Sequence, residues 1–476
     1  MVNKRIFDFW QRRPELEARL PGGGSAMAGR RSILIRFGLF LFLVAVWLVV
    51  MARPLRLLFI YSFPPRLFFK DFMQEWLIAK AVINHMNPYL PLADLAKIFF
   101  RPQPSAIGLG LPSSHPPPVV FIALPFGLLE YQQAAQVWMV CEIACIVASS
   151  YIVLVWWQGR RPSPVSLVLM VLLLMVFAPF WEDLLYGQLS SLLLLLLLCV
   201  WRSSRQTLAG VFLGTALSLK LMGAPVLLFF LVRKKWRCAG VALGVFILFN
   251  LAAAVVMGFE HVIYYYRLVA GSIAWIHLLV EWNCSIWTLG WRLFAGVQGP
   301  FMQSSIILPL FRLPGIAPYV SMVLLAGIMA AGLLLAVRAR DRDVSYALLF
   351  CLTAASGPIM WMHYLVLLLL PFAVALRYLK NFGFLKVPTA LWVLLLIALT
   401  VPDYALANML DHFNINRHAS GPVTLSFWAG LFTLVPLAVT LALIALVAWL
   451  ARSRPGYNDS KGSRSVFDSC LQKHDR

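Results

Sequence analysis

Asp71 and Glu75 are acidic side chains four residues apart, in a segment that follows the first long apolar run of the chain. If this segment is helical, both carboxylates lie on one face of the helix. A carboxylate held beside a hydroxyl group can take its proton as the oxygen attacks, whereas a covalent mechanism usually needs a second carboxylate as nucleophile. We therefore take Asp71 as the candidate general base, with Glu75 and the adjacent Trp76 as candidate substrate contacts.

A structural role is the alternative for Asp71. An aspartate before a helical run often caps the helix, because its carboxylate accepts a hydrogen bond from a backbone N–H of the first turn. The segment 72–85 is predicted to be such a short helix, and the sequence Asn87-Pro88-Tyr89 breaks it. The two roles can coexist, so the sequence leaves both open.

Two other polar side chains stand in short connections between apolar runs. His115 is followed by three prolines that stiffen its loop, so it is a candidate contact for a phosphate or a hydroxyl; the alternative is a solvated loop histidine. Gln188 follows Gly187, which allows a tight turn, and its carboxamide can hydrogen-bond sugar hydroxyls. Glu182 and Asp183 crowd the same connection, although an ordinary helix–helix turn is the alternative there.

Three further candidates lie later in the chain. Lys220 ends an apolar run and could pair with a lipid phosphate, as a bound diester and as a leaving group; a snorkelling lysine is the alternative. Asn283 is a candidate pocket residue, with plain loop structure as the alternative. His363 lies between Trp361 and Tyr364, whose aromatic rings indicate an interface belt. This histidine could bind a phosphate or orient the base, or it could be a helix-terminal residue without a catalytic role.

The composition indicates the class of protein that must position these side chains. Of 476 residues, 61% are hydrophobic and only 12% are charged, and the mean hydropathy is +0.82. Soluble proteins carry about 25% charged residues, so this is a polytopic membrane protein. The net charge of +21 does not indicate nucleic acid, because lysines and arginines lie in short clusters between apolar runs. The seven cysteines form no CxxC pair and most lie in apolar runs, so we expect neither a disulfide framework nor a thiolate metal site. We also expect no cofactor.

The apolar runs predict an all-α bundle of about twelve transmembrane helices over 33–452, behind a basic leader, 1–32, and before a tail, 453–476. The first span, 33–52, is followed by a long outer loop, 53–132, that carries Asp71 and His115. The other predicted spans are 133–157, 164–181, 189–201, 207–219, 222–233, 238–257, 318–337, 344–357, 363–378, 387–401 and 425–450.

The charge pattern predicts the orientation of the bundle. The run 119–129 has only eleven residues between prolines, so we expect it to lie at the membrane surface. Most lysine and arginine clusters then fall in the cytoplasm, together with both termini. Polar side chains in the membrane cost roughly 2–3 kcal/mol each and tend to mark function. One polar cavity at the outer leaflet would collect Asp71, His115, Glu182, Asp183, Gln188, Lys220, Glu281, Asn283 and His363.

Several motifs are missing from the sequence, and their absence narrows the function. The sequence contains no phosphate-binding Walker loop, no dinucleotide fingerprint followed by a βαβ pattern and no HExxH motif. The polar stretches are too short for a soluble catalytic domain, which favours a donor drawn from the membrane. The rival hypotheses are a transporter or lipid flippase, although we see no inverted repeat and the charges gather at one face, and an envelope-glycan ligase or polymerase.

The chain resembles glycosyltransferase family 87, polytopic enzymes of the GT-C superfamily that use polyprenyl-phosphate-linked sugars, typically mannose. The matching pieces run in order from about residue 70 to 375. They are Asp71-Phe72, Trp76, Ala79-Lys80-Ala81, Asn87-Pro88-Tyr89, His115-Pro116-Pro117, Pro125, Trp138, Tyr186-Gly187-Gln188, Ala209-Gly210, Gly214, Lys220, Pro225, Trp361 and His363.

The resemblance implies a GT-C-type bundle with outer juxtamembrane helices and a metal-independent reaction. It makes Asp71 the catalytic base and His363 the candidate for a required outer-side histidine. The expected activity is a hexosyltransferase of the inner (plasma) membrane that moves a sugar, with mannose expected, from a polyprenyl-phosphate carrier to a lipid-linked or cell-envelope glycan. The expected partners are that donor, the lipid or glycan acceptor and membrane lipids, without nucleic acid.

Overall fold

The computed structural model describes residue 42 and residues 45–100, 110–299, 305–380, 386–415 and 422–453. The predicted leader, 1–32, and the predicted tail, apart from Ser453, lie outside these residues. The chain divides into two compact units, Met1–Leu55 and Arg56–Arg476. The described residues of the first unit are helical, which agrees with the predicted first span for the part described. The sections below concern the second unit.

The second unit begins with short elements that carry the first candidate residues. The helix predicted over 72–85 is present as α4 and ends two residues early, where His85 has a φ of +55°. Most of the run 119–129 forms the short helix α6. The elements are η1 (Arg66–Phe69), α4 (Met73–Ile83), α5 (Leu92–Phe99), η2 (Pro117–Val119) and α6 (Val120–Gly127).

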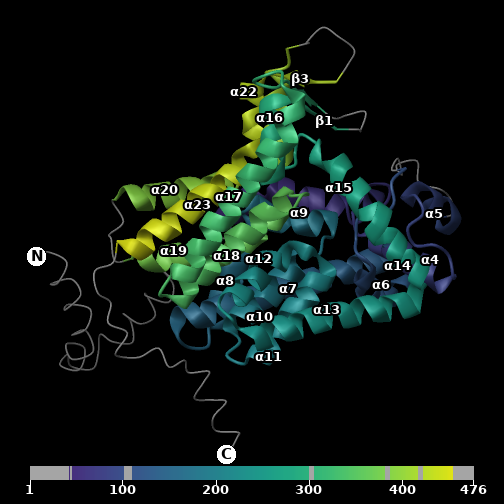
Figure 1. Ribbon diagram of the computed structural model, residues 1–476, viewed down its shortest axis with the longest axis horizontal. Helices are drawn as coiled ribbons and strands as arrows, with labels where there is room; N and C mark the ends of the chain where they lie inside the picture. The colour runs from purple at the N-terminus through teal and green to yellow at the C-terminus, as the bar shows by residue number, and fades with distance from the viewer. Residues whose placement is uncertain are drawn as a thin grey trace, which may run out of the picture. The chain divides into compact units, whose positions relative to one another are not determined.

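A series of helices follows, drawn in blue to green in Figure 1. They are α7 (Tyr131–Gln158), α8 (Pro164–Met175), α9 (Ala178–Tyr186), α10 (Ser190–Arg202), α11 (Gln206–Leu219), η3 (Leu221–Gly223), α12 (Ala224–Val232), α13 (Trp236–Met257), α14 (Phe259–Tyr264), η4 (Tyr265–Val269), α15 (Ala270–Leu278), η5 (Ile286–Thr288), α16 (Leu289–Phe294), η6 (Pro314–Ile316) and α17 (Ala317–Arg338).

The last part of the chain returns to the same bundle. Its elements are α18 (Arg342–Ser356), η7 (Met362–Leu368), α19 (Leu369–Leu379), α20 (Val387–Ala398), α21 (Asp403–Asp411), α22 (Phe427–Gly430), η8 (Leu431–Leu434) and α23 (Val435–Arg452). A small sheet joins three segments that are far apart in sequence: β1 (Val297–Gln298) pairs antiparallel with β2 (Ile306–Ile307), which pairs parallel with β3 (Thr424–Leu425).

The helical class of the structure agrees with the sequence prediction, but the predicted number of transmembrane spans is not confirmed by the structure. Among the described residues, five helical stretches are long and apolar enough to cross a membrane, or six if α8 and α9, bent by 82°, form one span. The predicted count of twelve is not confirmed. Several predicted spans, such as 189–201 and 207–219, are apolar helices shorter than the ~20 residues that a ~30 Å layer requires.

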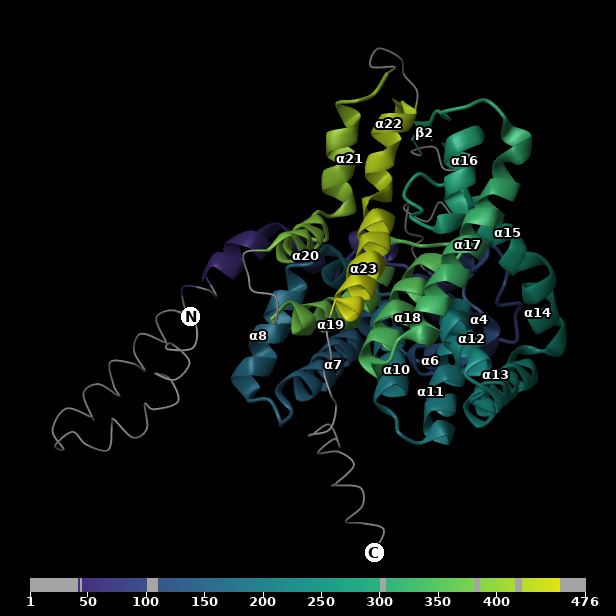
Figure 2. The ribbon, with the colours of Figure 1, turned by 60° about the vertical axis from the view of Figure 1, so that its left-hand side comes forward.

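Close packing of α11 against α13 fixes the helix that ends at Lys220. A Cβ added to Gly210 would lie 2.6 Å from the carbonyl oxygen of Cys238, and one added to Gly214 would lie 2.5 Å from that of Ala242. Figures 1 and 2 both show the two helices side by side. Small residues four apart allow this approach in membrane helices, so the Gly-x-x-x-Gly spacing holds Lys220 in place.

Candidate active site

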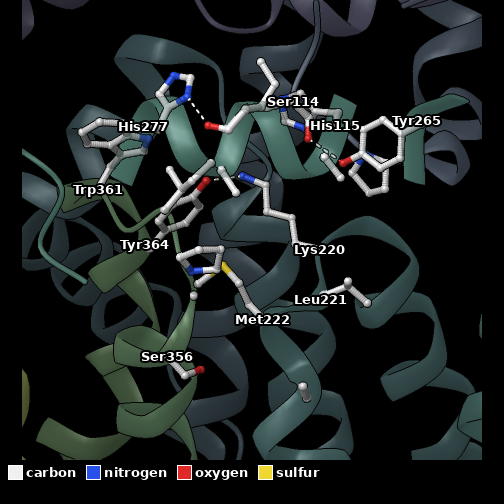
Figure 3. Close-up of a pocket in the computed structure, with 18 of the residues that line it drawn as sticks. Ser114, His115, Lys220, Leu221, Met222, Tyr265, His277, Ser356, Trp361 and Tyr364 are labelled. Carbon is white, nitrogen blue, oxygen red and sulfur yellow. Dashed lines mark hydrogen bonds between the residues drawn. The ribbon is translucent and has the colours of Figure 1, made fainter. Parts of the chain in front are cut away.

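A cavity of about 570 Å³ lies where segments from distant parts of the chain meet (Figure 3). One part of its wall is polar, and another is built from apolar side chains of η3, α12, α15 and α17. The polar part includes Asp71, Gln74, Ser114, His115, Gln188, Lys220, His277 and Tyr364, and the apolar part includes Leu221, Met222, Leu228, Ile273, Leu325 and Met329.

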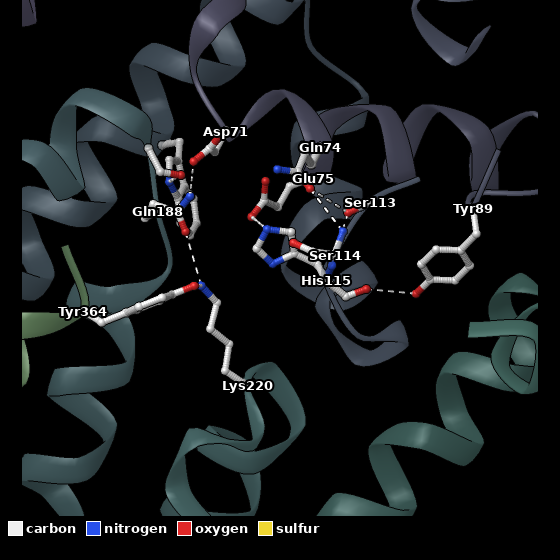
Figure 4. Close-up of polar contacts among 12 residues, drawn as sticks. Asp71, Gln74, Glu75, Tyr89, Ser113, Ser114, His115, Gln188, Lys220 and Tyr364 are labelled. Atoms are coloured by element: carbon white, nitrogen blue, oxygen red, sulfur yellow. Dashed lines mark hydrogen bonds and ion pairs between the residues drawn. The ribbon is translucent and has the colours of Figure 1, made fainter. Parts of the chain in front are cut away.

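Asp71 lies in the turn before α4 with its carboxylate directed at Gln188 (Figure 4). Its Oδ2 accepts a hydrogen bond from Gln188 Nε2 at 2.5 Å. The helix starts at N-cap Phe72 without any side-chain cap, so the interpretation of Asp71 as an N-cap is wrong. Burial raises the pKa of Asp71 from 3.8 to about 6, while the Gln188 hydrogen bond and the charges of Lys220 and Lys70 lower it. A base with a pKa near the working pH is well suited to proton abstraction.

Gln188 links Asp71 to a lysine and a tyrosine. Its Oε1 accepts a hydrogen bond from Lys220 Nζ at 3.2 Å, and the same ammonium donates to Tyr364 Oη at 2.8 Å. Lys220 reaches this place because α11 ends there and its own backbone is extended. These contacts use two of the three N–H donors of the ammonium group. The arrangement places a cation and a partly ionised carboxylate on either side of one carboxamide.

The glycine before Gln188 makes the turn that the sequence predicts. Gly187 has a φ of +70°, and a Cβ on it would lie 2.9 Å from Phe72 Cβ. Glu182 and Asp183, however, lie within α9 and not in a connection, because that helix continues to Tyr186 after the bend. Asp183 is buried and accepts hydrogen bonds from the backbone and hydroxyl of Ser191, so it caps the start of α10 instead of facing the cavity.

His115 and Glu75 form a buried pair beside the cavity. His115 Nε2 lies 3.2 Å from Glu75 Oε1, and both side chains are about 97% or more buried. Burial raises the pKa of Glu75 to about 8 and lowers that of His115 well below 6.5. Both shifts favour the uncharged forms of the two side chains, which contact each other at hydrogen-bond distance. His115 lines the cavity, whereas Glu75 lies behind it.

Two predicted substrate contacts lie in the wall behind the cavity. Trp76 donates from Nε1 to Leu129 O at 3.1 Å and stacks on Phe100. Asn283 donates to Pro358 O at 2.8 Å and accepts from Met360 N at 3.0 Å, so it shapes the loop that contributes part of the lining. Neither side chain lines the cavity in the structure.

His363 is also buried and does not line the cavity. Its ring lies 4.4 Å from the ring of Tyr364 and 6.5 Å from that of Tyr186. Within the described part of the chain, its Nε2 has no hydrogen-bond partner. The histidine thus stands next to the tyrosine that contacts Lys220, one layer behind the cavity surface.

Tyr364, Trp361 and His277 line the cavity but were not among the predicted site residues. The interface-belt interpretation is wrong for Tyr364, which is buried and accepts a hydrogen bond from Lys220. An aromatic residue at the end of an apolar run has the same sequence signal in both positions, so only packing separates them. Among the described residues, no group of three or more His, Cys, Asp or Glu side chains is arranged to hold a metal ion.

Comparison with known proteins places the chain in a family. The model of glycosyltransferase family 87 matches residues 114–362, slightly more than half of the chain; Asp71 precedes the match and His363 follows it directly. A polyprenol-phosphate-mannose-dependent alpha-(1-2)-phosphatidylinositol mannoside mannosyltransferase of Mycobacterium tuberculosis is 32% identical over 183 residues, which cover 36% of this chain and 40% of that relative. No solved structure matches. The chain belongs to glycosyltransferase family 87.

Proposed function

We propose that the protein transfers a hexose, with mannose as the expected sugar, from a polyprenyl-phosphate carrier to a hydroxyl group of a lipid-linked or cell-envelope glycan. Asp71 acts as the general base. The observation that carries this proposal is the hydrogen-bonded series Asp71–Gln188–Lys220 in the wall of one cavity (Figure 4). The series supplies a base, a sugar contact and a cation for a phosphate in one place.

Asp71 suits a direct displacement. It takes the proton of the acceptor hydroxyl while that oxygen bonds to the anomeric carbon, and the bond from this carbon to the carrier phosphate breaks. A covalent mechanism would need a second ionised carboxylate about 5 Å away as nucleophile. Glu75 does not meet this requirement, because it is paired with His115 and does not line the cavity, and burial raises its pKa. The single available carboxylate therefore favours inversion at the anomeric carbon.

Lys220 is placed to stabilise the leaving phosphate. Its ammonium group lines the cavity and is held by Gln188 and by Tyr364. Fixed positive charge directed at an oxygen that gains negative charge is among the larger contributions to catalysis. His363, which packs on Tyr364, would support this phosphate site from behind, and His115 would contact a sugar hydroxyl or the phosphate.

The apolar part of the cavity fits the lipid part of such a donor. Leu228 on α12, Ile273 on α15 and Leu325 on α17 line it, and α17 is one of the candidate membrane spans. An amphiphile needs a polar site and an apolar path next to each other. A polyprenyl phosphate would place its phosphate near Lys220 and its isoprenoid chain among these helices.

We propose that the cavity faces the outer leaflet of the inner membrane, with both termini in the cytoplasm. The helices α10 and α18 each have one end at the cavity and the other at a basic cluster. At that far end, Asp343 pairs with Arg377 and accepts a hydrogen bond from Trp201 Nε1. Basic residues at helix ends favour the cytoplasm, which supports an outer location for the opposite ends.

The test is transfer of labelled mannose from synthetic polyprenyl-phosphate-mannose to a glycolipid acceptor by the purified protein. Asp71→Asn keeps the shape of the side chain but removes the base, so we expect kcat to fall by about 10²–10⁴-fold. Asp94→Asn, at an exposed position of α5, is the matched control and should leave kcat unchanged.

Wild-type kcat in Asp71→Asn would exclude the proposed base. Movement of the carrier across liposomes without cleavage of the sugar–phosphate bond would favour a flippase instead. Release of a carrier diphosphate in place of a monophosphate would indicate the ligase or polymerase alternative.

A further inference from the structure

Three hydrogen bonds tie the two residues that flank Asp71 to the backbone just before Gln188. Lys70 Nζ donates to Leu184 O and to Leu185 O, both at 2.8 Å. Phe72 N donates to Tyr186 O at 3.2 Å. The two residues that flank Asp71 thus hold the last turn of α9, and the Asp71–Gln188 hydrogen bond lies next to these contacts.

Lys70 is unusual because it is only 3% exposed. Burial lowers its pKa to about 8, and the charges of Glu142 and Asp71 oppose this effect. The last carbonyl groups of a helix lack intrahelical donors, and a cation is favourable at a helix C-terminus. Lys70 supplies both a positive charge and two hydrogen-bond donors at the C-terminus of α9. The buried ammonium group is therefore paired with the carbonyls of Leu184 and Leu185.

We propose that Lys70 is a positioning residue for glycosyl transfer: by binding the carbonyls of Leu184 and Leu185, it holds Asp71 at hydrogen-bond distance from Gln188. This inference rests on the proposed function of Asp71 as the base. Asp71 and Gln188 come from segments more than a hundred residues apart, and neither the turn before α4 nor the Gly187 turn is part of a longer helix. A contact between two turns needs an additional constraint, and the Lys70 ammonium provides it.

The two hydrogen bonds from Lys70 to the carbonyls of Leu184 and Leu185 predict a particular kinetic effect. The cation proposed for the donor phosphate, Lys220, lies at the end of α11 and keeps its hydrogen bond to Tyr364 when Lys70 is lost. Loss of Lys70 should therefore lower kcat, because the base is misplaced, and should change the donor KM little. Misplacement of a catalytic group by about 1 Å costs on the order of 10²-fold in rate.

The pH profile should also change. Titratable and polar groups from several elements surround Asp71 and interact with it. They are Lys70 in the same segment, Glu75 on α4, Tyr131 on α7, Tyr186 on α9, Gln188 after α9 and Lys220 after α11. Lys70 is one of two cations that lower the pKa of Asp71. Its removal raises that pKa, so the loss of activity on acidification begins at a higher pH than in the wild type.

The experiment compares Lys70→Met, Lys70→Arg and the exposed control Lys97→Met in the mannose-transfer assay, with kcat, donor KM and pH profile measured for each. Methionine keeps the length and apolar stem of the lysine but removes its donors and charge. In Lys70→Met we expect about a 10²-fold lower kcat and an unchanged donor KM. The acid limb of its pH profile should lie at a higher pH than in the wild type. Lys70→Arg restores the charge and should return the acid limb to the wild-type position.

If Lys70→Met has the same kcat, donor KM and pH profile as Lys97→Met while Asp71→Asn is inactive, Lys70 does not position the base. The assignment of Asp71 as the base would then stand. Wild-type activity in Asp71→Asn would instead remove the proposed function itself. If Lys70→Met does not give monodisperse protein, Lys70→Gln decides, because glutamine keeps one donor without charge. An unchanged acid limb in Lys70→Gln would show that Lys70 has only a structural role and would overturn the proposal.

Discussion

The chemistry depends on how four side chains share hydrogen bonds. Asp71, Gln188, Lys220 and Tyr364 form one series in which the carboxamide donates to the acid and accepts from the ammonium. Gln188 therefore cannot rotate its amide without losing both contacts. Its orientation is set by charge on both sides, so it can fix the relative positions of the base and the cation before substrate binds.

Activity should fall on acidification through the pKa of Asp71, near 6 and not near the ordinary aspartate value of 3.8. The base acts only when ionised, so activity is present above this pKa and is lost below it. Gln188→Leu removes a hydrogen bond that lowers the pKa, and the acid limb should move to higher pH. The measurement is kcat/KM of mannose transfer between pH 5 and 9.

Gln206→Leu, at an exposed position at the start of α11, is the control and should keep the wild-type profile. An acid limb near pH 4 in the wild-type enzyme would contradict the assignment of Asp71 as a buried base. An unchanged limb in Gln188→Leu would show that the hydrogen bond has no influence on the ionisation of Asp71.

At the scale of elements, the site depends on where helices stop. The helix α9 ends at Tyr186, α11 ends before Lys220, and α4 begins after Asp71, so each polar group stands at a helix end. Such ends project side chains into a cavity that a continuous helix would close. The packing of Phe72 against Trp138, with ring centroids 5.4 Å apart, holds the start of α4 against α7.

Gly187→Ala should reduce transfer much more than it reduces stability. The φ of +70° costs an alanine about 1–2 kcal/mol, and its Cβ would also lie 2.9 Å from Phe72 Cβ. The clash would push apart the turns that carry Gln188 and Asp71. Gly159→Ala is a matched control, because Gly159 has a φ of +66° and no atom within 4 Å of an added Cβ.

We expect both glycine variants to lower the Tm by a similar amount, whereas only Gly187→Ala loses activity. Thermal unfolding in detergent and the mannose-transfer assay measure the two effects separately. Equal activity in the two variants would mean that the contact with Phe72 does not position the site.

At the scale of the whole molecule, the cavity lies at one end of helices whose other ends carry basic residues. Asp343 accepts hydrogen bonds from Trp156 and Trp201 and pairs with Arg377, which joins the far ends of α7, α10, α18 and α19. A bundle closed at one end in this way leaves the other end available for substrates. The distribution of charge then decides which end faces the cytoplasm.

A membrane-impermeant maleimide applied to intact cells should label Asp94→Cys, on the exposed face of α5, but not Lys234→Cys, in the connection between α12 and α13. Both positions are exposed, and the proposed orientation puts them on opposite sides of the membrane. The unsubstituted chain, with its native cysteines, gives the background. Labelling of Lys234→Cys alone would reverse the orientation and place the cavity in the cytoplasm.

Much of the fold class and part of the site could be predicted from residue types and spacing. Hydropathy and charge are properties of the residues themselves, so the helical membrane class, the short helix after Asp71 and the turn at Gly187 follow from the sequence. The number of spans does not, because an apolar run does not reveal where a helix bends, as between α8 and α9.

The tertiary structure decided which polar residues meet. Asp71, His115, Gln188 and Lys220 line one cavity, whereas Trp76, Asn283 and His363 lie behind its wall. It also separated the roles of two adjacent residues, since Asp71 contacts Gln188 while Lys70 binds the end of α9. The last two contacts join segments more than a hundred residues apart, and no local pattern encodes the direction in which a side chain points after helices pack.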